Sequence, residues 1–475
     1  MHAVTHVWKT EGCGPLDVLV KGSPEAISQL CRCTAERRRE ILEDTASLAH
    51  DGLRVLGVAS GSFEGDSLPS SPAEFQLEFR GLLGLADPVR ASVPGALSEC
   101  YGAGIRVMMI TGDYPETARA IARSIGLDMS SGIVTGADIA ESSEEALRQR
   151  VKHANIFARV APDHKLRLVN ALKANGEVVA MTGDGVNDAP ALKAAHIGVA
   201  MGRRGTDVAR EAASLVLLDD DFASLVTAVR QGRRIYDNIR NAMIYLLAVH
   251  IPIAGMGILP VLLGWPLFLF PVHVVFLEFV IDPACSLVFE AERSEADVMS
   301  RPPRDRHQPL FGHSMLIQSA AQGVAVLIAV VAVYGIALHN VDEKAARASA
   351  FITLVLGNLL LILANRSRRE SLLAILSRPN RTFWWICLLA TASLAAAIRV
   401  PSAASIFRFE PPSLRSVALG AGAAVLAVAW IEMARLLKRR RRLGVAFECK
   451  KIALVRELKA AGLNFIMDGA RPRGA

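Results

Sequence analysis

The apolar positions divide the chain into two halves at about Arg240. Before this point, short apolar runs of strand length alternate with charged segments of helical length. Val178–Met181 is typical of a buried parallel strand, and Ile105–Ile110 is a second run of this kind. Strands that alternate with helices favour a parallel sheet covered by helices on both faces. We therefore predict a doubly wound α/β fold for the first half.

The second half contains six nearly uncharged stretches of about 20 residues, the length that spans a bilayer as a helix. The predicted spans are Ala242–Leu263, Phe268–Phe289, Met315–Leu338, Ala348–Ala364, Phe383–Ile398 and Leu414–Leu437. Only a short turn at Gly264-Trp265-Pro266 separates the first two, which predicts a hairpin. The amino-terminal residues lack the layout of a signal peptide, so we expect the internal spans to direct insertion.

Basic residues gather in the loops after the even-numbered spans. They are Arg293, Arg301, Arg304 and Arg306, then Arg366, Arg368, Arg369, Arg378 and Arg381, and finally Lys438 to Arg442. The opposite loops hold only Lys344, Arg347, Arg399 and Arg408. By the positive-inside rule we expect an integral protein of a bacterial cell membrane, with its soluble half and C-terminus cytoplasmic. Contact with anionic lipid is a second role for the basic segment after the sixth span.

Composition agrees with this division. A chain of 475 residues predicts two or three domains, and 52% apolar content is high for a wholly soluble protein. The net charge of +7 reflects basic residues around the apolar spans, which indicates membrane topology and not nucleic-acid binding. The seven cysteines form no CxxC pair, so we expect unpaired thiols in a reducing compartment.

The run Thr182–Ala195 (TGDGVNDAPALKAA) carries the clearest chemistry. It places Asp184 and Asp188 four residues apart, directly after a predicted strand, with Gly183 and Gly185 allowing a tight turn. Two carboxylates at the carboxyl end of a parallel strand suit Mg²⁺. The alternative is an acidic turn that only caps the following helix.

Two further segments carry groups suited to phosphate. Thr111-Gly112-Asp113 follows the other predicted strand, and a hydroxyl with free backbone N–H groups at a strand end can bind a phosphoryl oxygen. Lys165 ends the segment Phe157–Lys165 (FARVAPDHK) before a predicted helix, where its ammonium would offset phosphate charge. Each segment alone is a weak signal.

In this order, the segments resemble the haloacid-dehalogenase-like core of P-type cation-pumping ATPases. Thr182–Ala195 resembles the hinge motif of that family along the whole length of the motif. Lys21–Glu25 (KGSPE) resembles the KGAPE motif of this family, and Gly52-Leu-Arg54 resembles its arginine-bearing stretch near the nucleotide. Asp87–Arg90 (DPVR) resembles its DPPR element, with Val in the third position. The resemblance extends from about Val18 to Leu437.

The resemblance implies ATP and Mg²⁺ as cofactors and a transported cation as a further partner. It implies that Asp184 and Asp188 hold Mg²⁺. The implied catalytic residues are Thr111, Gly112, Asp113, Lys165 and Asn187. The implied nucleotide-binding residues are Lys21, Arg54, Asp113 and Arg159.

It also implies a division into four parts: a partial nucleotide-binding domain (1–84), a phosphorylation domain without its nucleophile strand (85–240), six membrane helices (241–437) and a basic cytoplasmic tail (438–475). Six spans after the hinge motif resemble type II pumps, the calcium and sodium–potassium class. Heavy-metal pumps are expected to have two, and the chain has no Cys-Pro-Cys motif.

The second predicted span carries Glu278 and Asp282, one helical turn apart on one face. Ionisable groups inside spans are costly and usually functional, and Pro283 tends to free backbone carbonyls that can bind a cation. The alternative is that the carboxylates reach towards water at a span end. The sequence gives equal weight to a buried histidine and an ion-path residue at His250, and Asn358 is more typical of helix packing than of ion binding.

Calcium-type pumps usually place oxygen ligands where this chain has Ile253 and Ile281, which leaves the transported ion open.

Three parts of a complete pump are absent from the sequence: the DKTGT segment with the phosphorylated aspartate, the TGE-bearing actuator domain and the four preceding spans. Ser214–Asp221 superficially resembles the start of a dehalogenase-like core, but it follows the other motifs and lacks the Lys-Thr that should come after Asp219. We therefore expect the C-terminal half of a pump, completed by an N-terminal half encoded upstream. The alternatives are a truncated, non-catalytic membrane protein that retains nucleotide or ion binding, and a membrane-anchored phosphatase.

Overall fold

The computed structural model describes residues 3–9, 15–65, 67–367, 370 and 372–434. These residues form two compact units. The first comprises residues up to 230 together with 299–303, and the second comprises 231–298 and the residues after 303. The predicted tail, 438–475, and the last three residues of the predicted sixth span lie outside the described residues.

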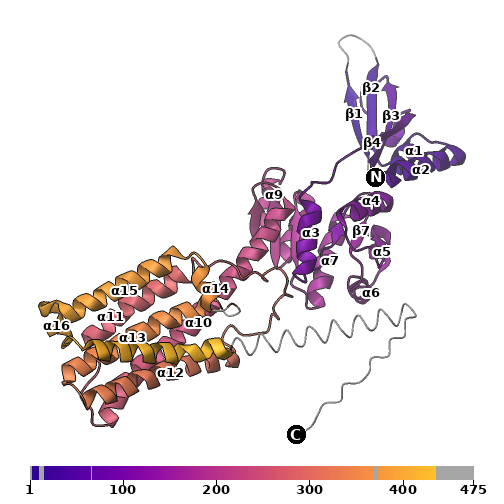
Figure 1. Cartoon of the computed structure of the whole chain (residues 1–475). Coiled ribbons are helices and arrows are strands. Elements are labelled where there is room, and N and C mark those ends of the chain that lie inside the picture. Colours follow the sequence, from indigo (N-terminus) through magenta and orange to yellow (C-terminus); the bar gives the residue numbers. More distant parts are fainter. Residues whose placement is uncertain (1–2, 10–14, 66, 368–369, 371, 435–475) are drawn as a thin grey trace, which may run out of the picture. The chain divides into compact units, whose positions relative to one another are not determined.

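An antiparallel sheet of four strands, hydrogen-bonded in chain order, opens the first unit. The strands are β1 (Ala3–Trp8), β2 (Leu16–Gly22), β3 (Arg54–Phe63) and β4 (Glu78–Leu85). Helices α1 (Pro24–Leu30) and α2 (Ala35–His50) lie beside this sheet (Figure 1). Along β2, buried Val18 and Val20 alternate with exposed Leu19, as a strand with one covered face requires. The two valines pack against Ile27 of α1.

The remainder of the first unit is an α/β fold with parallel strands, which confirms the predicted class. One sheet has the order β5-β7-β6 and the other has the order β10-β9-β8. The strands are β5 (Met109–Ile110), β6 (Ile133–Thr135), β7 (Ile156–Ala158), β8 (Ala180–Gly183), β9 (Ile197–Met201) and β10 (Leu215–Leu217). The strand predicted at Ile105–Ile110 is shorter than its apolar run, because only Met109 and Ile110 pair with β7.

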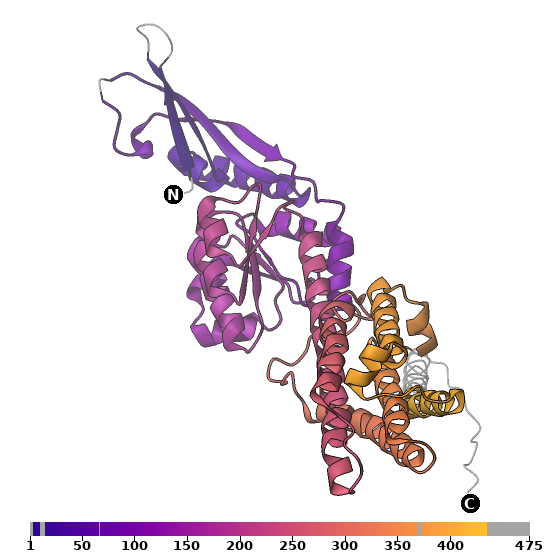
Figure 2. The same ribbon diagram turned by 90° about the vertical axis from the view of Figure 1, so that its left-hand side faces the viewer.

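Helices cover both faces of these strands (Figure 2). They are α3 (Val93–Gly102), α4 (Pro115–Ile125), α5 (Gly136–Glu141), α6 (Glu144–Arg150), α7 (Pro162–Ala174), α8 (Ala189–Ala194) and α9 (Asp207–Ala212). In β7, Ile156 and Ala158 pack with α3 and α4, whereas Phe157 packs in a cluster with α5 to α9. Met181 of β8 belongs to the same cluster as Phe157, so the two sheets share one apolar core.

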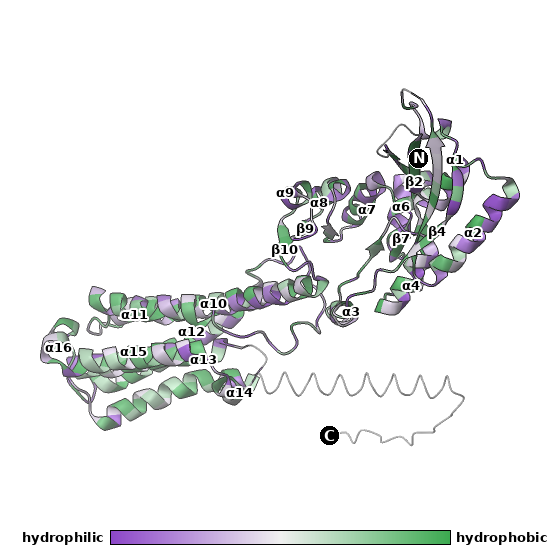
Figure 3. Cartoon of the chain, turned by 90° about the horizontal axis from the view of Figure 1, so that it is seen from above, coloured by the Kyte–Doolittle hydropathy of each residue, from purple (hydrophilic) through white to green (hydrophobic). Residues whose placement is uncertain are grey.

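Among the described residues, six helices are long and apolar enough to cross a membrane, as predicted (Figure 3). They are α10 (Phe222–Leu262), α11 (Pro271–Pro283) with the π-helical turn Ala284–Val288, α12 (His313–Leu338), α13 (Glu343–Asn365), α15 (Arg381–Arg399) and a last helix, Leu414–Ala434. Short helices α14 (Leu372–Ser377) and α16 (Pro401–Phe407) flank α15. In α13, 89% of the most apolar stretch is buried, against 28–39% in the others, so α13 is the central helix of the second unit.

Helix α10 is longer than the predicted first span. It starts at Phe222, not Ala242, and its 41 residues continue through Pro252 and Pro260. At 1.5 Å per residue this is roughly 60 Å, about twice the hydrocarbon thickness of a bilayer. The onset of apolar residues at Ala242 therefore marks a change of environment within one helix and not the start of the helix.

Candidate functional site

The turn after β8 folds the carboxylate of Asp188 back onto its own backbone. Asp188 Oδ2 accepts hydrogen bonds from the backbone N–H groups of Asp184 and Gly185, each at 3.3 Å. Gly183 makes this close return possible, because a Cβ atom there would lie 2.5 Å from the Cβ of Asp188. The Asp188 side chain is 8% exposed, whereas Asp184 is exposed. The sequence predicted this turn correctly, and it presents one buried and one open carboxylate.

Lys165 pairs with the buried carboxylate. Its Nζ atom lies 2.5 Å from Asp188 Oδ1, and its side chain is 20% exposed. Lys165 belongs to α7, which follows β7 of one sheet, whereas Asp188 follows β8 of the other. The ion pair therefore connects the carboxyl ends of the two parallel sheets. It joins a predicted phosphate-binding residue to a predicted metal-binding residue.

The Thr111–Asp113 segment forms a second polar turn, after β5. Thr111 Oγ1 donates a hydrogen bond to Asp113 Oδ2 and accepts one from the Asp113 N–H, both at 3.1 Å. The N–H groups of Arg159 and Val160 donate to the carbonyls of Asp113 and Thr111, each at 3.0 Å. Residues from the ends of β5 and β7 are thus held side by side. Gly112 is exposed between them.

The predicted nucleotide-binding cations fall into three different surroundings. Arg54 Nε lies 3.5 Å from Asp113 Oδ1, but two thirds of the Arg54 side chain is exposed. Arg159 Nη2 lies 2.8 Å from Glu25 Oε1. Lys21 is exposed on β2, and the described part of the chain gives its side chain no ion pair. The structure therefore brings Arg54 to Asp113 and Arg159 to Glu25.

Glu25 and Tyr114 are polar partners that the sequence analysis did not single out. The Arg159 guanidinium lies over the Tyr114 ring, 4.1 Å from its centroid. Burial raises the pKa of Glu25, but the Tyr114 hydroxyl and the Arg159 charge outweigh burial and bring its pKa below 4.5. The sequence held a signal that could have identified Glu25, because this residue is the last of the KGSPE motif.

In the membrane unit, the structure brings His250 of α10 to Glu278 of α11. His250 Nε2 lies 3.8 Å from Glu278 Oε1, and His250 Nδ1 lies 2.7 Å from the Leu246 carbonyl. Half of the His250 side chain is exposed, and both of its ring nitrogens lie near polar atoms of the protein. Asp282 is exposed. Asn358 is buried in α13, and its Oδ1 atom has no hydrogen-bond partner among the described residues.

Pro283 interrupts the helix as expected. The α-helix ends at this residue, and a π-helical turn follows it. The carbonyl of Asp282 is occupied, because it accepts a hydrogen bond from Ser286 Oγ at 2.5 Å. One of the two lone pairs of this carbonyl is therefore engaged within the helix.

The residues after β8 fit a partial Mg²⁺ site. Within the described ranges, no group of three or more His, Cys, Asp and Glu side chains is arranged to hold a metal ion. Mg²⁺ commonly takes one or two carboxylates and completes its shell with water and phosphate oxygens. The exposed Asp184 and the adjacent Asp188 match that donor set. In such a site these two carboxylates would supply two ligands, and phosphate and solvent would supply the rest.

Asp219 is placed away from this site. It follows β10, which β9 separates from β8 in the sheet. Its carboxylate accepts hydrogen bonds from Ser224 Oγ at 2.6 Å and from the Asp221 N–H at 3.1 Å. These contacts describe a capped turn and give no support to Asp219 as a nucleophile.

Two family descriptions match separate parts of the chain. "Cation transporting ATPase, C-terminus" matches residues 266–437. "Haloacid dehalogenase-like hydrolase" matches residues 18–196, and a second description with the same wording matches residues 165–229. The fold and the matches therefore define a haloacid-dehalogenase-like domain joined to the membrane region of a cation-transporting ATPase.

Curated relatives agree with this class. The chain is 35% identical over 399 residues to calcium-transporting ATPase 1 of Bacillus cereus, covering 80% of this chain and 45% of the relative. It is 39% identical over 364 residues to the calcium-transporting ATPase of Bacillus subtilis, covering 74% and 41%. It is 40% identical over 309 residues to the probable cation-transporting ATPase F of Mycobacterium tuberculosis, covering 62% and 34%. The chain belongs to the P-type cation-transporting ATPases and spans less than half the length of these relatives.

Proposed function

We propose that this chain supplies the Mg²⁺-binding catalytic core and the membrane ion path of an ATP-driven cation pump, and that another segment supplies the phosphate-accepting aspartate. One observation carries this proposal. Strands β5 and β8 are both edge strands, and no ladder joins them within the described part of the chain. Yet their sheets share a core, and the Lys165–Asp188 pair connects their carboxyl ends.

One further parallel strand between β5 and β8 would join the two sheets into one. Such a strand would be apolar on both faces, since helices cover both faces of the sheet. Its carboxyl end would lie beside Thr111 on one side and Asp184 on the other. A carboxylate at that end would face the groups predicted to bind phosphate and Mg²⁺. This is the position that the proposal gives to the phosphate acceptor.

The candidate site residues then take distinct roles. Lys165 and the Thr111 hydroxyl hold the phosphoryl oxygens, because an ammonium and a hydroxyl both donate to an anion. Asp184 and Asp188 hold Mg²⁺, which when bound neutralises phosphate charge. Arg54 and Arg159 bind the nucleotide phosphates after exchanging their present carboxylate partners for ATP. Lys21, Gly112, Asp113 and Asn187 complete the candidate set.

The same proposal assigns Glu278 and Asp282 to the cation path, with His250 beside them and Asn358 as a further candidate. Two carboxylates inside an apolar, membrane-spanning helix support this role, because ionisable groups at such positions are costly and usually functional. We expect Glu278→Gln and Asp282→Asn to abolish transport in a reconstituted whole pump. Unchanged uptake of every tested cation in both variants would remove the two residues from the path. The soluble unit then lies on the cytoplasmic side, as the basic loops indicate.

Metal binding by the purified chain tests the catalytic assignment. Mn²⁺, which paramagnetic resonance detects, is the probe, and Mg²⁺ is the competitor. We expect Asp184→Asn to weaken Mn²⁺ binding, with Asp207→Asn as a control at another exposed aspartate. Equal binding by both variants and the unmodified chain would contradict the assignment.

The alternative, a non-catalytic membrane protein that retains nucleotide or ion binding, has one observation in its favour. Glu25 and Asp113 neutralise two of the arginines that would bind nucleotide phosphates. This alternative predicts that the chain binds ATP or a cation but takes up no acid-stable label from ATP, even when a segment containing DKTGT is joined to it. The pump proposal predicts labelling in that joined protein, and weaker ATP binding in Lys21→Ala and Arg54→Ala.

A further inference from the structure

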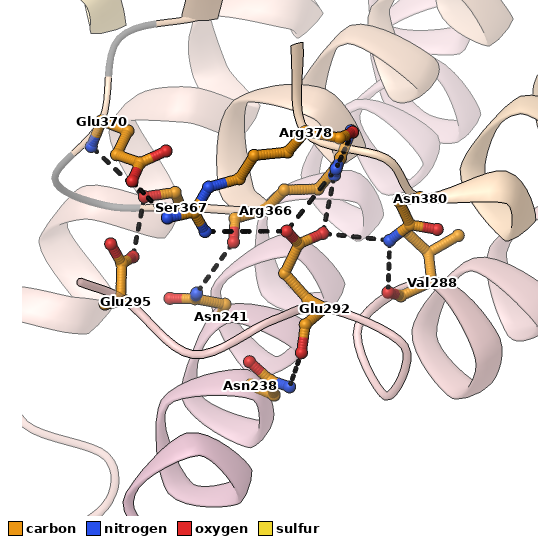
Figure 4. A network of polar contacts seen from close by, with 10 residues as sticks. All are labelled: Asn238, Asn241, Val288, Glu292, Glu295, Arg366, Ser367, Glu370, Arg378 and Asn380. Carbon is orange, nitrogen blue, oxygen red and sulfur yellow. Dashed lines mark hydrogen bonds and ion pairs between the residues drawn. The ribbon is translucent and has the colours of Figure 1, made fainter. Parts of the chain in front are cut away.

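A buried carboxylate, Glu292, connects several helices of the second unit (Figure 4). Glu292 lies in the turn after the π-helical segment and is 3% exposed. Its Oε2 atom accepts hydrogen bonds from Arg366 Nε at 2.7 Å and from Asn380 Nδ2 at 3.0 Å. The Arg366 side chain is fully buried. Arg366 is one of the basic residues that follow the fourth predicted span, and its side chain pairs with Glu292 instead of facing solvent.

Two arginines and two glutamates balance the charge of this cluster. Arg378 Nη1 lies 3.9 Å from Glu292 Oε1, and Arg378 also pairs with Glu370. Arg366 Nη2 donates to the Arg378 carbonyl at 3.3 Å. Because a buried charge is stable only when it is paired and hydrogen-bonded, each member constrains the positions of the others. We call Glu292, Arg366, Glu370, Arg378 and Asn380 the Glu292 clamp.

The clamp holds the ends of three helical elements together. Arg366 follows α13 directly. Asn380 caps the amino terminus of α15, where its Oδ1 accepts from the Phe383 N–H at 3.0 Å. Its Nδ2 also donates to the Val288 carbonyl, at the end of the π-helical turn, at 3.1 Å. The clamp therefore fixes the end of the element that carries Glu278 and Asp282.

Helix α10 is attached to the same carboxylate residue. Asn238 Nδ2 donates to the Glu292 backbone carbonyl at 3.1 Å, and Asn238 is buried. At 1.5 Å per residue, Asn238 lies roughly 18 Å before His250 along α10, and Glu292 follows Glu278 by 14 residues. The short connection between α10 and α11 closes the other end of this hairpin. The contact between His250 and Glu278 lies between the two closed ends.

We propose that Glu292 is a positioning residue that sets the register of α10 against α11, and through it the distance between His250 and Glu278. A helix pair fixed at both ends cannot slide without breaking either the turn or the Asn238–Glu292 bond. Glutamine or apolar residues in place of the charged ones could pack the ends of α10 and α11 without fixing their register. The distance between His250 and Glu278 matters for cation binding only if the proposed ion path is correct. The register of α10 against α11 is independent of that proposal.

Cross-linking in the full chain in detergent micelles tests the register. The seven native cysteines are replaced by serine, and His250→Cys and Glu278→Cys are introduced together. A short bis-methanethiosulfonate reagent then reports how the two positions face each other. We expect Glu292→Gln to slow cross-linking on the order of tenfold, because a reaction between held groups depends steeply on their placement. Glu290→Gln, an exposed neighbour, is the matched control and should leave the rate unchanged.

A second variant covers the case in which Glu292→Gln does not fold. Asn238→Ala removes the attachment of α10 but leaves every charge of the clamp paired, and it should also slow cross-linking. Rates equal to the control in either folded variant, with unchanged elution and helicity, overturn the positioning role. The two proposals fail in different ways. If the ion-path assignment is wrong, transport is unaffected in Glu278→Gln, while Glu292→Gln still slows cross-linking.

Discussion

Replacing Lys165 by methionine should destabilise the turn after β8. The substitution keeps an apolar stem of similar length but leaves the carboxylate of Asp188 without its ammonium partner. Removing one partner of a buried ion pair costs about 3–5 kcal/mol. Two features lower that figure: the Lys165 side chain is 20% exposed, and Asp188 keeps two backbone hydrogen bonds. We therefore expect a loss of roughly 2–3 kcal/mol at pH 7.

Hydrogen exchange of the amides in 180–188 measures this loss locally. A loss of that size raises the opening equilibrium roughly 30- to 150-fold. In a double-mutant cycle with Asp188→Asn, the double variant should lose less stability than the sum of the two single losses. The difference should be at least about 1 kcal/mol, because the two residues share one interaction.

Glu144→Gln is the matched control. Glu144 is the exposed partner of Arg167, which lies on α7 two residues after Lys165 and keeps two backbone carbonyl acceptors at 2.8 Å. We expect a change below about 1 kcal/mol for this substitution. Additive losses in the cycle, or equal exchange in Lys165→Met and the unmodified chain, would refute the structural importance of the pair.

Two further predictions concern the first unit. Gly183→Ala should displace the Asp188 carboxylate and cost on the order of 1–3 kcal/mol by the same exchange measurement. Gly185→Ala is its control, since a Cβ there would meet Asp188 only at 3.7 Å, and equal effects of both would contradict the geometry. Because the folded-state pKa of Glu25 is lowered, its stabilising pair with Arg159 is complete above pH 4.5 and is lost as the pH falls through the folded-state pKa. The stability gap between the unmodified chain and Glu25→Gln should therefore shrink on acidification in denaturant titrations, and a widening gap would contradict the assigned sign.

The fold class and the six spans were predictable because hydrophobic periodicity and length are local properties of the sequence. The glycines and aspartates of the hinge motif likewise determine their own turn, which the structure reproduces at Gly183 and Asp188. The length of α10 was not predictable from the apolar run, since its first 20 residues mix apolar with polar and charged side chains and still continue the same helix. The apolar run alone did not show that β5 would pair over two residues only.

The partners of charged groups were the least predictable feature. Lys165 and Asp188 are 23 residues apart, and Glu292 and Arg366 are 74 apart. No local pattern connects residues at such separations. In the sequence, Arg366 and Arg347 look like ordinary loop charges. In the structure both side chains are buried and donate hydrogen bonds to specific oxygen atoms. Burial of an arginine depends on whether the tertiary fold supplies a carboxylate or carbonyls at its end, and only the structure provides that information.

The most direct test of the account is the formation of an acid-stable phosphoenzyme from labelled ATP. The account places the phosphate acceptor on a strand outside this sequence, between β5 and β8. It predicts that the purified chain alone incorporates no acid-stable label, and that labelling appears when a segment containing DKTGT is joined to it. Robust labelling of the chain alone, lost in Asp219→Asn, would contradict the account.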